Sequence, residues 1–208
     1  MKNTEYIIES PKLTIVNSFI ESVEYDTIDT LNWHSLSGNK IENLRNNIEE
    51  KLNNTDVFCD SSKFKFIVSC DSQRVGKRVN YVTTIVFLKV GYGGIVYYLK
   101  EIDDIPNFVS RYKDNDKAKR RLNMQSIMRR RLWNECLKSV KCAVWLDKIL
   151  EKYSLSVSEI HSDVNTDKRY KSSELMQAVN GYIESAGYIS ILKPNAWAAS
   201  SVANIKTK

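Results

Sequence analysis

The chain of 208 residues is predicted to fold as an α/β protein with a mixed five-stranded sheet flanked by helices. Three apolar, β-branched stretches follow one another between residues 64 and 99, which is typical of consecutive antiparallel strands. Two stretches with apolar residues at helical spacing then alternate with two short apolar runs. Because a helical connection returns the chain parallel to the neighbouring strand, this second half predicts parallel pairing. The predicted order is β-β-β-α-β-α-β.

The region before the sheet is predicted to contain an extension and one helix. Short apolar runs occur in residues 6–8 and 13–16, but neither a helical nor a strand period continues through them. After a polar loop, apolar residues recur at a spacing of three and four, which predicts one face of a helix; they are Ile41, Leu44, Ile48 and Leu52. We therefore expect an N-terminal arm over residues 1–32 and a folded domain over residues 33–208.

The first three strands are predicted at residues 64–70, 81–90 and 95–99. The polar stretch from Asp71 to Arg78 contains Gly76 and predicts the turn of a hairpin. A glycine-rich turn precedes the third strand. Because a strand and not a helix follows it, this turn is not predicted to cradle a phosphate.

The second half begins with a long helix, predicted over residues 122–152. Its apolar stripe comprises Met128, Leu132, Cys136, Val140 and Ala143. A fourth strand follows at residues 158–164, a helix that ends before Gly187 covers residues 172–186, and a fifth strand covers residues 188–192. Three antiparallel strands followed by two helical crossovers form the layout of ribonuclease H-like folds.

The composition excludes several classes of protein. The chain is 42% hydrophobic and 27% charged with three Pro and seven Gly, which excludes collagen-like and wholly disordered proteins. No apolar run reaches the roughly 18 residues of a membrane helix, and the first residues lack the pattern of a secretory signal. We expect a location in the cytoplasm or within a phage particle, and no membrane partner. The four cysteines form no CxxC pair, which favours free, mostly buried thiols over a zinc site or disulfides.

The charge is distributed unevenly along the chain. Residues 1–60 carry 5 Lys+Arg and 11 Asp+Glu, whereas residues 61–208 carry 26 and 14. The candidate nucleic-acid-binding residues in the basic part are Lys117, Lys119, Arg120, Arg121, Arg129, Arg130 and Arg131. A second interpretation stays open, in which the same residues form a solvated helix face or bind the acidic arm of a neighbouring subunit.

Two carboxylates are predicted to meet at one end of the sheet. Asp71 directly follows the first predicted strand, and Asp163 lies late in the fourth. If these strands are parallel neighbours, the two acids repel each other, and a divalent cation relieves the repulsion while it activates a bound water. Oxygen ligands favour Mg²⁺ or Mn²⁺ over Zn²⁺. The third ligand could be Glu135 on the long helix or Asp167 beyond the fourth strand.

The predicted catalytic residues are thus Asp71, Asp163 and Glu135, and the predicted metal ligands are these three and Asp167. Structural roles remain open: Asp71 could cap a turn through Ser72, and Glu135 could extend from the edge of the apolar face into water. His161 shares the predicted face of Asp163 because side chains alternate along a strand. It could support a metal ligand, or it could be a core residue with satisfied hydrogen bonds.

Three sequence motifs resemble those of the YkuK-like family, a ribonuclease H-like group of unknown function. They are Cys70-Asp71-Ser72-Gln73, Ile160-His161-Ser162-Asp163-Val164-Asn165 and the stretch Lys193-Pro194-Asn195-Ala196-Trp197-Ala198-Ala199-Ser200-Ser201-Val202-Ala203-Asn204. The resemblance covers roughly residues 33–208. It implies a ribonuclease H-like fold and, by analogy, metal-dependent phosphodiester cleavage in which Asp71 and Asp163 match the acids of strands one and four. Two positions depart from the expected pattern, because Asn165 replaces a glycine and Asn204 stands where a nuclease would have a carboxylate.

Two functions therefore remain open from the sequence. The first is a nuclease or nucleic-acid-processing protein that uses Mg²⁺ or Mn²⁺ and grips phosphates with its basic helix. The second is a non-catalytic structural protein that reuses the fold, such as a phage connector or tail-ring component that forms a homo-oligomer or larger assembly through its acidic N-terminal arm.

Overall fold

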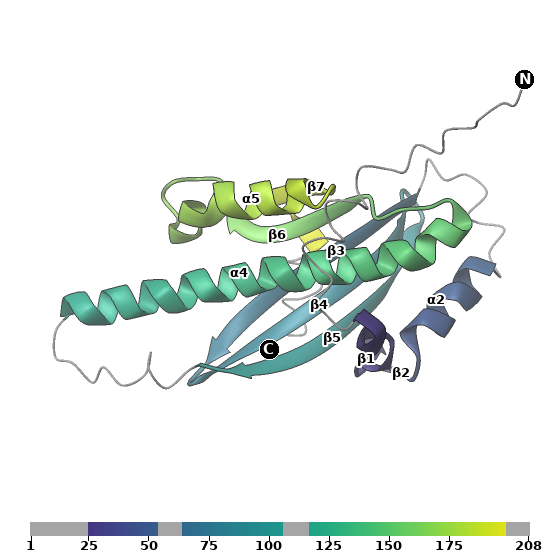
Figure 1. Cartoon of the computed structure of the whole chain (residues 1–208), viewed down its shortest axis with the longest axis horizontal. Helices are drawn as coiled ribbons and strands as arrows, with labels where there is room; N and C mark the ends of the chain where they lie inside the picture. Colours follow the sequence, from purple (N-terminus) through teal and green to yellow (C-terminus); the bar gives the residue numbers. More distant parts are fainter. Residues whose placement is uncertain (1–24, 54–63, 106–116, 199–208) are drawn as a thin grey trace, which may run out of the picture.

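In the part of the chain that the structure describes, a seven-stranded sheet lies at the centre and helices pack against it (Figure 1). The computed structural model describes residues 25–53, 64–105 and 117–198. The strand order is β2-β1-β5-β4-β3-β6-β7, and the long helix α4 (Lys117–Leu150) crosses one face of the sheet. The predicted α/β class with a mixed sheet is confirmed.

Three long antiparallel strands form the middle of the sheet. They are β3 (Phe64–Val75), β4 (Arg78–Lys89) and β5 (Gly93–Asp104). A two-residue turn joins β3 to β4, and its Gly76 has a φ of 62°, a backbone conformation that glycine adopts without steric cost.

These strands extend further than the sequence predicts. Asp71 does not follow the first strand but lies inside it, paired with Val82. The apolar run ends at Cys70, but the backbone of β4 continues to pair with β3 as far as Val75 and Arg78. An apolar pattern in the sequence indicates which side chains are buried, whereas the length of a strand depends on its partner backbone. The apolar run therefore predicts only the first part of β3 and not its polar end.

The second half of the chain adds two parallel strands through helical crossovers, as predicted. After α4 come the 3-10 helix η4 (Glu151–Tyr153) and β6 (Glu159–Asn165), which runs parallel to β3. The 3-10 helix η5 (Lys171–Leu175) and α5 (Met176–Ser185) then lead to β7 (Ile189–Lys193), parallel to β6. The carboxyl ends of β3, β6 and β7 therefore point in the same direction.

The N-terminal part of the described chain adds two strands to the predicted five. The 3-10 helix η1 (Tyr25–Thr30) precedes β1 (Trp33–Ser35), which pairs with β5, and β2 (Lys40–Ile41), which pairs with β1. Both strands are too short to show a period in the sequence. The predicted helix follows as α2 (Leu44–Asn53), with Leu44, Ile48 and Leu52 buried. Ile41, predicted on the same helix face, lies in β2 instead.

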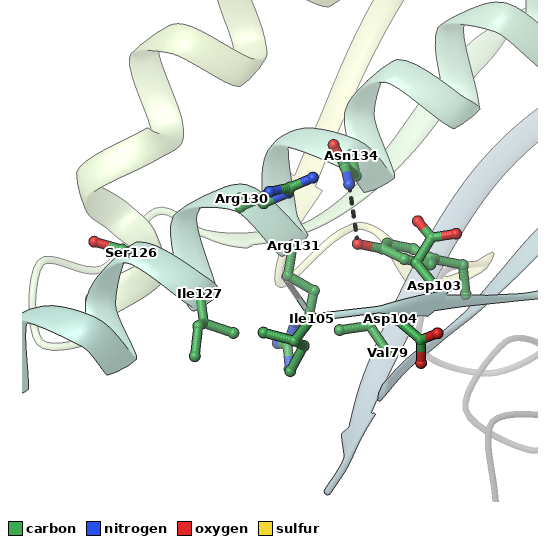
Figure 2. Close-up of a pocket in the computed structure, with 10 residues that line it drawn as sticks. Val79, Asp103, Asp104, Ile105, Ser126, Ile127, Arg130, Arg131 and Asn134 are labelled. Atoms are coloured by element: carbon green, nitrogen blue, oxygen red, sulfur yellow. Dashed lines mark hydrogen bonds between the residues drawn. The ribbon is translucent and has the colours of Figure 1, made fainter. Parts of the chain in front are cut away.

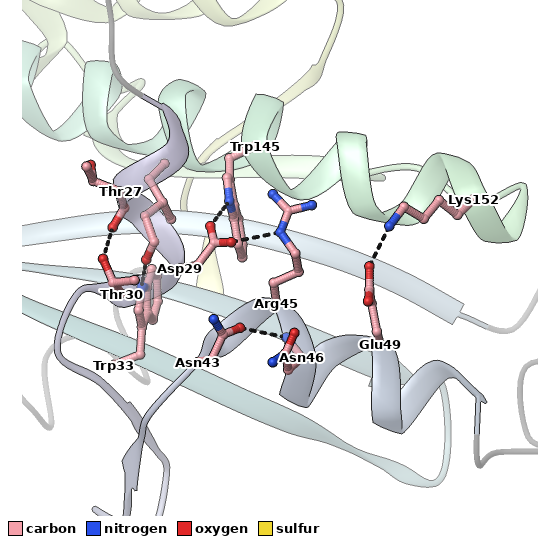
Figure 3. A network of polar contacts seen from close by, with 11 residues as sticks. Thr27, Asp29, Thr30, Trp33, Asn43, Arg45, Asn46, Glu49, Trp145 and Lys152 are labelled. Atoms are coloured by element: carbon pink, nitrogen blue, oxygen red, sulfur yellow. Dashed lines mark hydrogen bonds and ion pairs between the residues drawn. The ribbon is translucent and has the colours of Figure 1, made fainter.

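Polar contacts tie η1 to two helices (Figure 3). The Asp29 carboxylate accepts hydrogen bonds of 2.7 Å from the indole nitrogen of Trp145 and 2.7 Å from Nε of Arg45. Residues 25–32 thus contact the folded part of the chain, while residues 1–24 of the expected arm lie outside the described residues. The boundary at residue 33 stays a prediction.

The main core lies between α4 and the sheet face that contacts it. The predicted stripe of α4 is buried there, with Leu132, Cys136, Val140 and Ala143 at most 3% exposed. Of the four cysteines, Cys70, Cys136 and Cys142 are free and buried, as predicted, and Cys59 lies outside the described residues. Ile67 on the other side of β3 packs with Val86 and Ala198. Both faces of β3 are therefore covered near its middle.

Candidate active site

Asp71 and Asp163 lie on neighbouring parallel strands. The register pairs Ser69 with His161 and Cys70 with Ser162, so Asp71 on β3 and Asp163 on β6 come one residue later on each strand. Burial, followed by the negative charge of Asp163, raises the pKa of Asp71 to about 6. The predicted neighbourhood of these two acids is present, although Asp71 reaches it from within its strand.

Each of these acids also has a partner within the chain. An oxygen of the Asp163 carboxylate lies 2.5 Å from the ammonium nitrogen of Lys193, at the end of β7. The Asp71 carboxylate accepts a hydrogen bond of 2.8 Å from the backbone N–H of Ser72. The contact between Asp71 and Ser72 that the sequence left open is thus formed.

Glu135 approaches the same region from α4. Its side chain is 2% exposed, accepts a hydrogen bond from the Ser72 hydroxyl and lies 3.6 Å from Nε of Arg131. Its second oxygen, Oε2, is buried and has no hydrogen-bond partner among the described residues. The alternative in which Glu135 extends into water is therefore wrong, because α4 presses this position against β3.

The environment of Glu135 strongly favours its protonated form. Burial raises its pKa to about 8, and the negative charges of Asp71 and Asp163 raise it in the same direction. The hydrogen bond from Ser72 and the charge of Arg131 act in the opposite direction but do not offset the burial. The structure thus brings Asp71, Asp163 and Glu135 within electrostatic reach of one another.

Asp167 does not join the other three acids. It lies in the turn after β6, where Arg169 binds its carboxylate through Nε at 2.8 Å. The hydrogen bond from Arg169 lowers the pKa of Asp167, and its side chain is 34% exposed. Local ion pairing with a residue two positions away holds this acid in its turn.

His161 has the contacts of a core residue. It is 1% exposed; Nε2 lies 3.2 Å from a carboxylate oxygen of Glu159, and Nδ1 accepts a hydrogen bond of 3.2 Å from the backbone N–H of Ala198. Its ring packs edge-on against Trp197, and burial lowers its pKa. His161 therefore anchors the segment after β7, which fits the second of its two sequence interpretations.

The sequence predicts other roles for three residues of this polar network. It predicts Ser72 as a turn partner, Arg131 as a phosphate ligand and Lys193 as part of a motif. Arg131 lies four residues before Glu135, which is one helical turn, and this spacing was an available signal. Lys193 had no such local signal, because it reaches Asp163 only through strand pairing.

The described arginines of the basic stretch differ in their surroundings. Arg129 lies 2.8 Å from Glu174, and Arg131 faces Glu135. Arg130 is exposed and forms no ion pair with another residue that the structure describes. The side chains of Lys117, Lys119, Arg120 and Arg121 lie outside the described set.

The three acids have the donor chemistry that a hard divalent cation requires. Their ligands would all be oxygens, and the unpartnered Oε2 of Glu135 is a free, buried acceptor. In residues 25–53, 64–105 and 117–198, however, no three His, Cys, Asp or Glu side chains are gathered closely enough to hold a metal ion. Lys193 supplies the positive charge next to Asp163 instead. The residues fit Mg²⁺ or Mn²⁺ in type but do not form a closed set of ligands. For all three to hold one cation, the carboxylates would have to approach one another and Lys193 would have to leave Asp163.

Comparison with known proteins identifies one family. The family model described as Ribonuclease H-like matches residues 44–208. This region includes α2, the five strands from β3 to β7, and Asp71, Glu135 and Asp163. No curated protein and no solved structure matched the chain. Among the described residues, no helix is long and apolar enough to cross a membrane. Because the match spans well over half of the sequence and agrees with the observed sheet, the chain belongs to the ribonuclease H-like family, and this membership supports a nuclease-like or nucleic-acid-related function.

Proposed function

We propose that the protein is a metal-dependent phosphodiesterase that acts on nucleic acid, with Asp71, Asp163 and Glu135 as its catalytic carboxylates. The observation that carries this proposal is that Asp71 and Asp163 come at matching positions of two neighbouring parallel strands, with Glu135 of α4 within electrostatic reach of both. The charge of Asp163 raises the pKa of Asp71, and the charges of Asp71 and Asp163 raise the pKa of Glu135. Such repulsion costs stability and is relieved by a divalent cation. A buried apolar residue at position 135 would stabilise the core without that cost.

The residues have distinct roles in this proposal. Asp71, Asp163 and the free oxygen of Glu135 would hold Mg²⁺ or Mn²⁺, which nucleases of this family commonly use. A cation held there would supply an activated water and would stabilise charge on the phosphoryl oxygens. Ser72 orients Glu135 by its hydrogen bond. Lys193, once the cation takes its place at Asp163, would provide positive charge for a substrate phosphate.

The basic beginning of α4 is proposed to contact further phosphates. Arg130 supports this role because it is exposed and is not neutralised by an ion pair with a described residue. We assign the same role to the remaining basic residues of this stretch, which are Lys117, Lys119, Arg120, Arg121, Arg129 and Arg131.

Within the family, we propose that the chain belongs to the YkuK-like group. The Asp71-Ser72-Gln73 and His161-Ser162-Asp163 motifs support this assignment. In the structure, Asp71 and Ser72 contact the acid network, and His161 holds the backbone of Ala198 within the third motif.

One observation favours a second candidate function, a non-catalytic structural protein. The Lys193 ammonium lies 2.5 Å from Asp163 and can replace the positive charge of a cation there. A repurposed fold of this kind would act through its partners, for example as a phage connector or tail-ring component that oligomerises through the acidic arm of residues 1–32. This candidate requires no metal and no cleavage.

Calorimetric titration of the purified chain with Mg²⁺ and with Mn²⁺ tests the proposed function. We expect saturable binding that Asp71→Asn weakens at least about tenfold, because that change removes one ligand charge. Asp167→Asn is the matched control, since Asp167 pairs with Arg169 away from the other acids. Cleavage of RNA, DNA and hybrid substrates is then expected to depend on Asp71 and not on Asp167.

Absence of metal binding at millimolar concentrations would contradict the phosphodiesterase and favour the structural protein. Equal loss of binding in Asp71→Asn and Asp167→Asn would contradict the assignment of Asp71 as a ligand.

A further inference from the structure

A cavity of about 150 Å³ lies between the first half of α4 and the ends of β4 and β5. Figure 2 shows side chains from all three elements around it. Ile127 of α4 and Tyr81 of β4 form apolar parts of the cavity wall. Polar groups of the wall come from Asn134, Arg130 and Arg131 of α4 and from Asp103 of β5. A mainly apolar cavity with a few convergent polar groups is the usual form of a small-ligand site.

The cavity is adjacent to the proposed active site. Tyr81 pairs with Ser72 across β3 and β4, and Ser72 donates its hydroxyl hydrogen to Glu135. Arg131 both lines the cavity and lies 3.6 Å from Glu135. A ligand in the cavity would therefore lie one side chain away from the carboxylates.

The size and walls of the cavity suit a nucleobase better than a phosphate. A phosphate inside the cavity would lie against Ile127 and Tyr81 and beside the carboxylates of Asp103 and Asp104, which repel it. A planar base instead gains from burial against an aromatic ring and an aliphatic side chain. Arg130 and Arg131 on α4 provide the positive charge that the attached phosphate needs.

The polar groups of the cavity favour one chemical class of base. The Asn134 amide nitrogen donates a hydrogen bond of 3.3 Å to the Tyr81 hydroxyl, which leaves the amide oxygen to accept. Asp103 adds a carboxylate, which also accepts. Two acceptors match the exocyclic amino group of cytosine, adenine or guanine, and such a contact distinguishes these bases from uracil and thymine.

We propose that this cavity binds the nucleobase attached to the scissile phosphate and prefers bases that carry an exocyclic amino group. The inference rests on the proposed function for the identity of the substrate, but base binding itself requires no metal. Arg131 connects the two sites, because it contacts the carboxylate network from within the wall of the cavity.

The test is calorimetric titration of the full chain in EDTA with three probes: CMP, UMP and ribose 5-phosphate. CMP is expected to bind at least about fivefold more tightly than UMP, because one hydrogen-bonded base edge is worth at least about 1 kcal/mol. Ribose 5-phosphate, which has no base, is expected to bind more weakly than either. Asn134→Ala is expected to reduce the ratio of CMP to UMP affinity.

A second variant tests the location. Ile127→Trp fills the cavity and is expected to weaken CMP binding at least about tenfold, and its thermal midpoint shows whether the variant is folded. The matched control is Ile102→Trp, because Ile102 lies on β5 outside the cavity and is 63% exposed. CMP binding is expected to be unchanged in this control.

Equal affinity for CMP and ribose 5-phosphate, or unchanged CMP binding in a folded Ile127→Trp variant, would overturn the base site. Equal affinity for CMP and UMP would overturn the preference for an amino group. Failure of the proposed function can be distinguished from failure of the base site. In that case metal binding and cleavage would be absent while CMP binding in EDTA persists.

Discussion

The side chain of Glu135 shows how position changes the chemistry of a single residue. An exposed glutamate is ionised at neutral pH, but burial together with Asp71 and Asp163 raises the pKa of this one from 4.5 to about 8. Its nearest positive group, Arg131, lies 3.6 Å away and does not restore the ordinary pKa. At neutral pH and without a cation, Glu135 is therefore mainly protonated.

This raised pKa predicts a pH-dependent stability. Because the folded state binds the Glu135 proton more tightly than the unfolded state, the free energy of unfolding is highest below about pH 4.5 for this group and falls as the pH rises to about 8. The free energy of unfolding falls by roughly 3 to 5 kcal/mol over this range, because one pKa unit is worth about 1.4 kcal/mol. Glu135→Gln, which keeps an oxygen that accepts from Ser72, is expected to remove this part of the decline.

Urea unfolding in metal-free buffer at pH 5 and at pH 8.5 measures the difference. Glu174→Gln is the matched control, because Glu174 is an exposed partner of Arg129. Identical pH profiles for the wild-type chain and Glu135→Gln would show that Glu135 ionises normally.

At the scale of elements, the pairing of β4 with β5 depends on a close backbone approach. Gly94 pairs with Leu88, and a Cβ atom at this position would come within 2.5 Å of the backbone oxygen of Phe87. Gly181 in α5 is different, because a Cβ there would meet no atom within 4 Å. The two glycines therefore have different reasons to occur.

Alanine substitution of these glycines is expected to give opposite results. Gly94→Ala is expected to lower the free energy of unfolding by about 1–3 kcal/mol, because backbone atoms must shift to admit the methyl group. Gly181→Ala is expected to raise it by about 0.5–1 kcal/mol, because alanine favours the helix. Urea titration at one pH measures both, and a stable Gly94→Ala variant would show that the strands can separate at little cost.

At the scale of the whole molecule, positive charge is concentrated after residue 60. The chain carries a formal net charge of +6, although its first 60 residues are acidic. Arg130 of α4 is exposed and not paired with another described residue, whereas Arg129 is paired with Glu174. Nucleic-acid affinity should therefore depend more on Arg130 than on its neighbour.

The salt dependence of binding tests this difference. Arg130→Ala is expected to reduce the slope of log K against log salt for a single-stranded oligonucleotide by about 0.7, the value for one lost phosphate contact. Arg129→Ala is expected to reduce it less, because this arginine already has a partner. Fluorescence anisotropy in EDTA at several salt concentrations gives both slopes, and an unchanged slope in Arg130→Ala would exclude a phosphate contact at this residue.

Much of the fold could be predicted from local pattern. The stripe of Leu132, Cys136, Val140 and Ala143 predicts the buried face of α4, because helical periodicity directly records which side chains avoid water. The short strands β1 and β2 could not be predicted in this way. Their pairing depends on the edge of β5, which lies far away in the sequence.

The candidate site likewise has features that follow from local pattern and features that depend on distant contacts. By itself, the sequence determined the order of the elements and the position of Asp71 and Asp163 late in two apolar runs, because these patterns are local. The tertiary structure decided that β6 pairs with β3, which makes the two acids neighbours. Only the tertiary structure decided that Glu135 joins them while Asp167 does not, that Lys193 neutralises Asp163, and that a cavity adjoins Arg131. These features depend on distances between side chains from separate elements. The packing of α4 and β7 against β3 and β6 sets these distances, and such packing produces no periodic signal in the sequence.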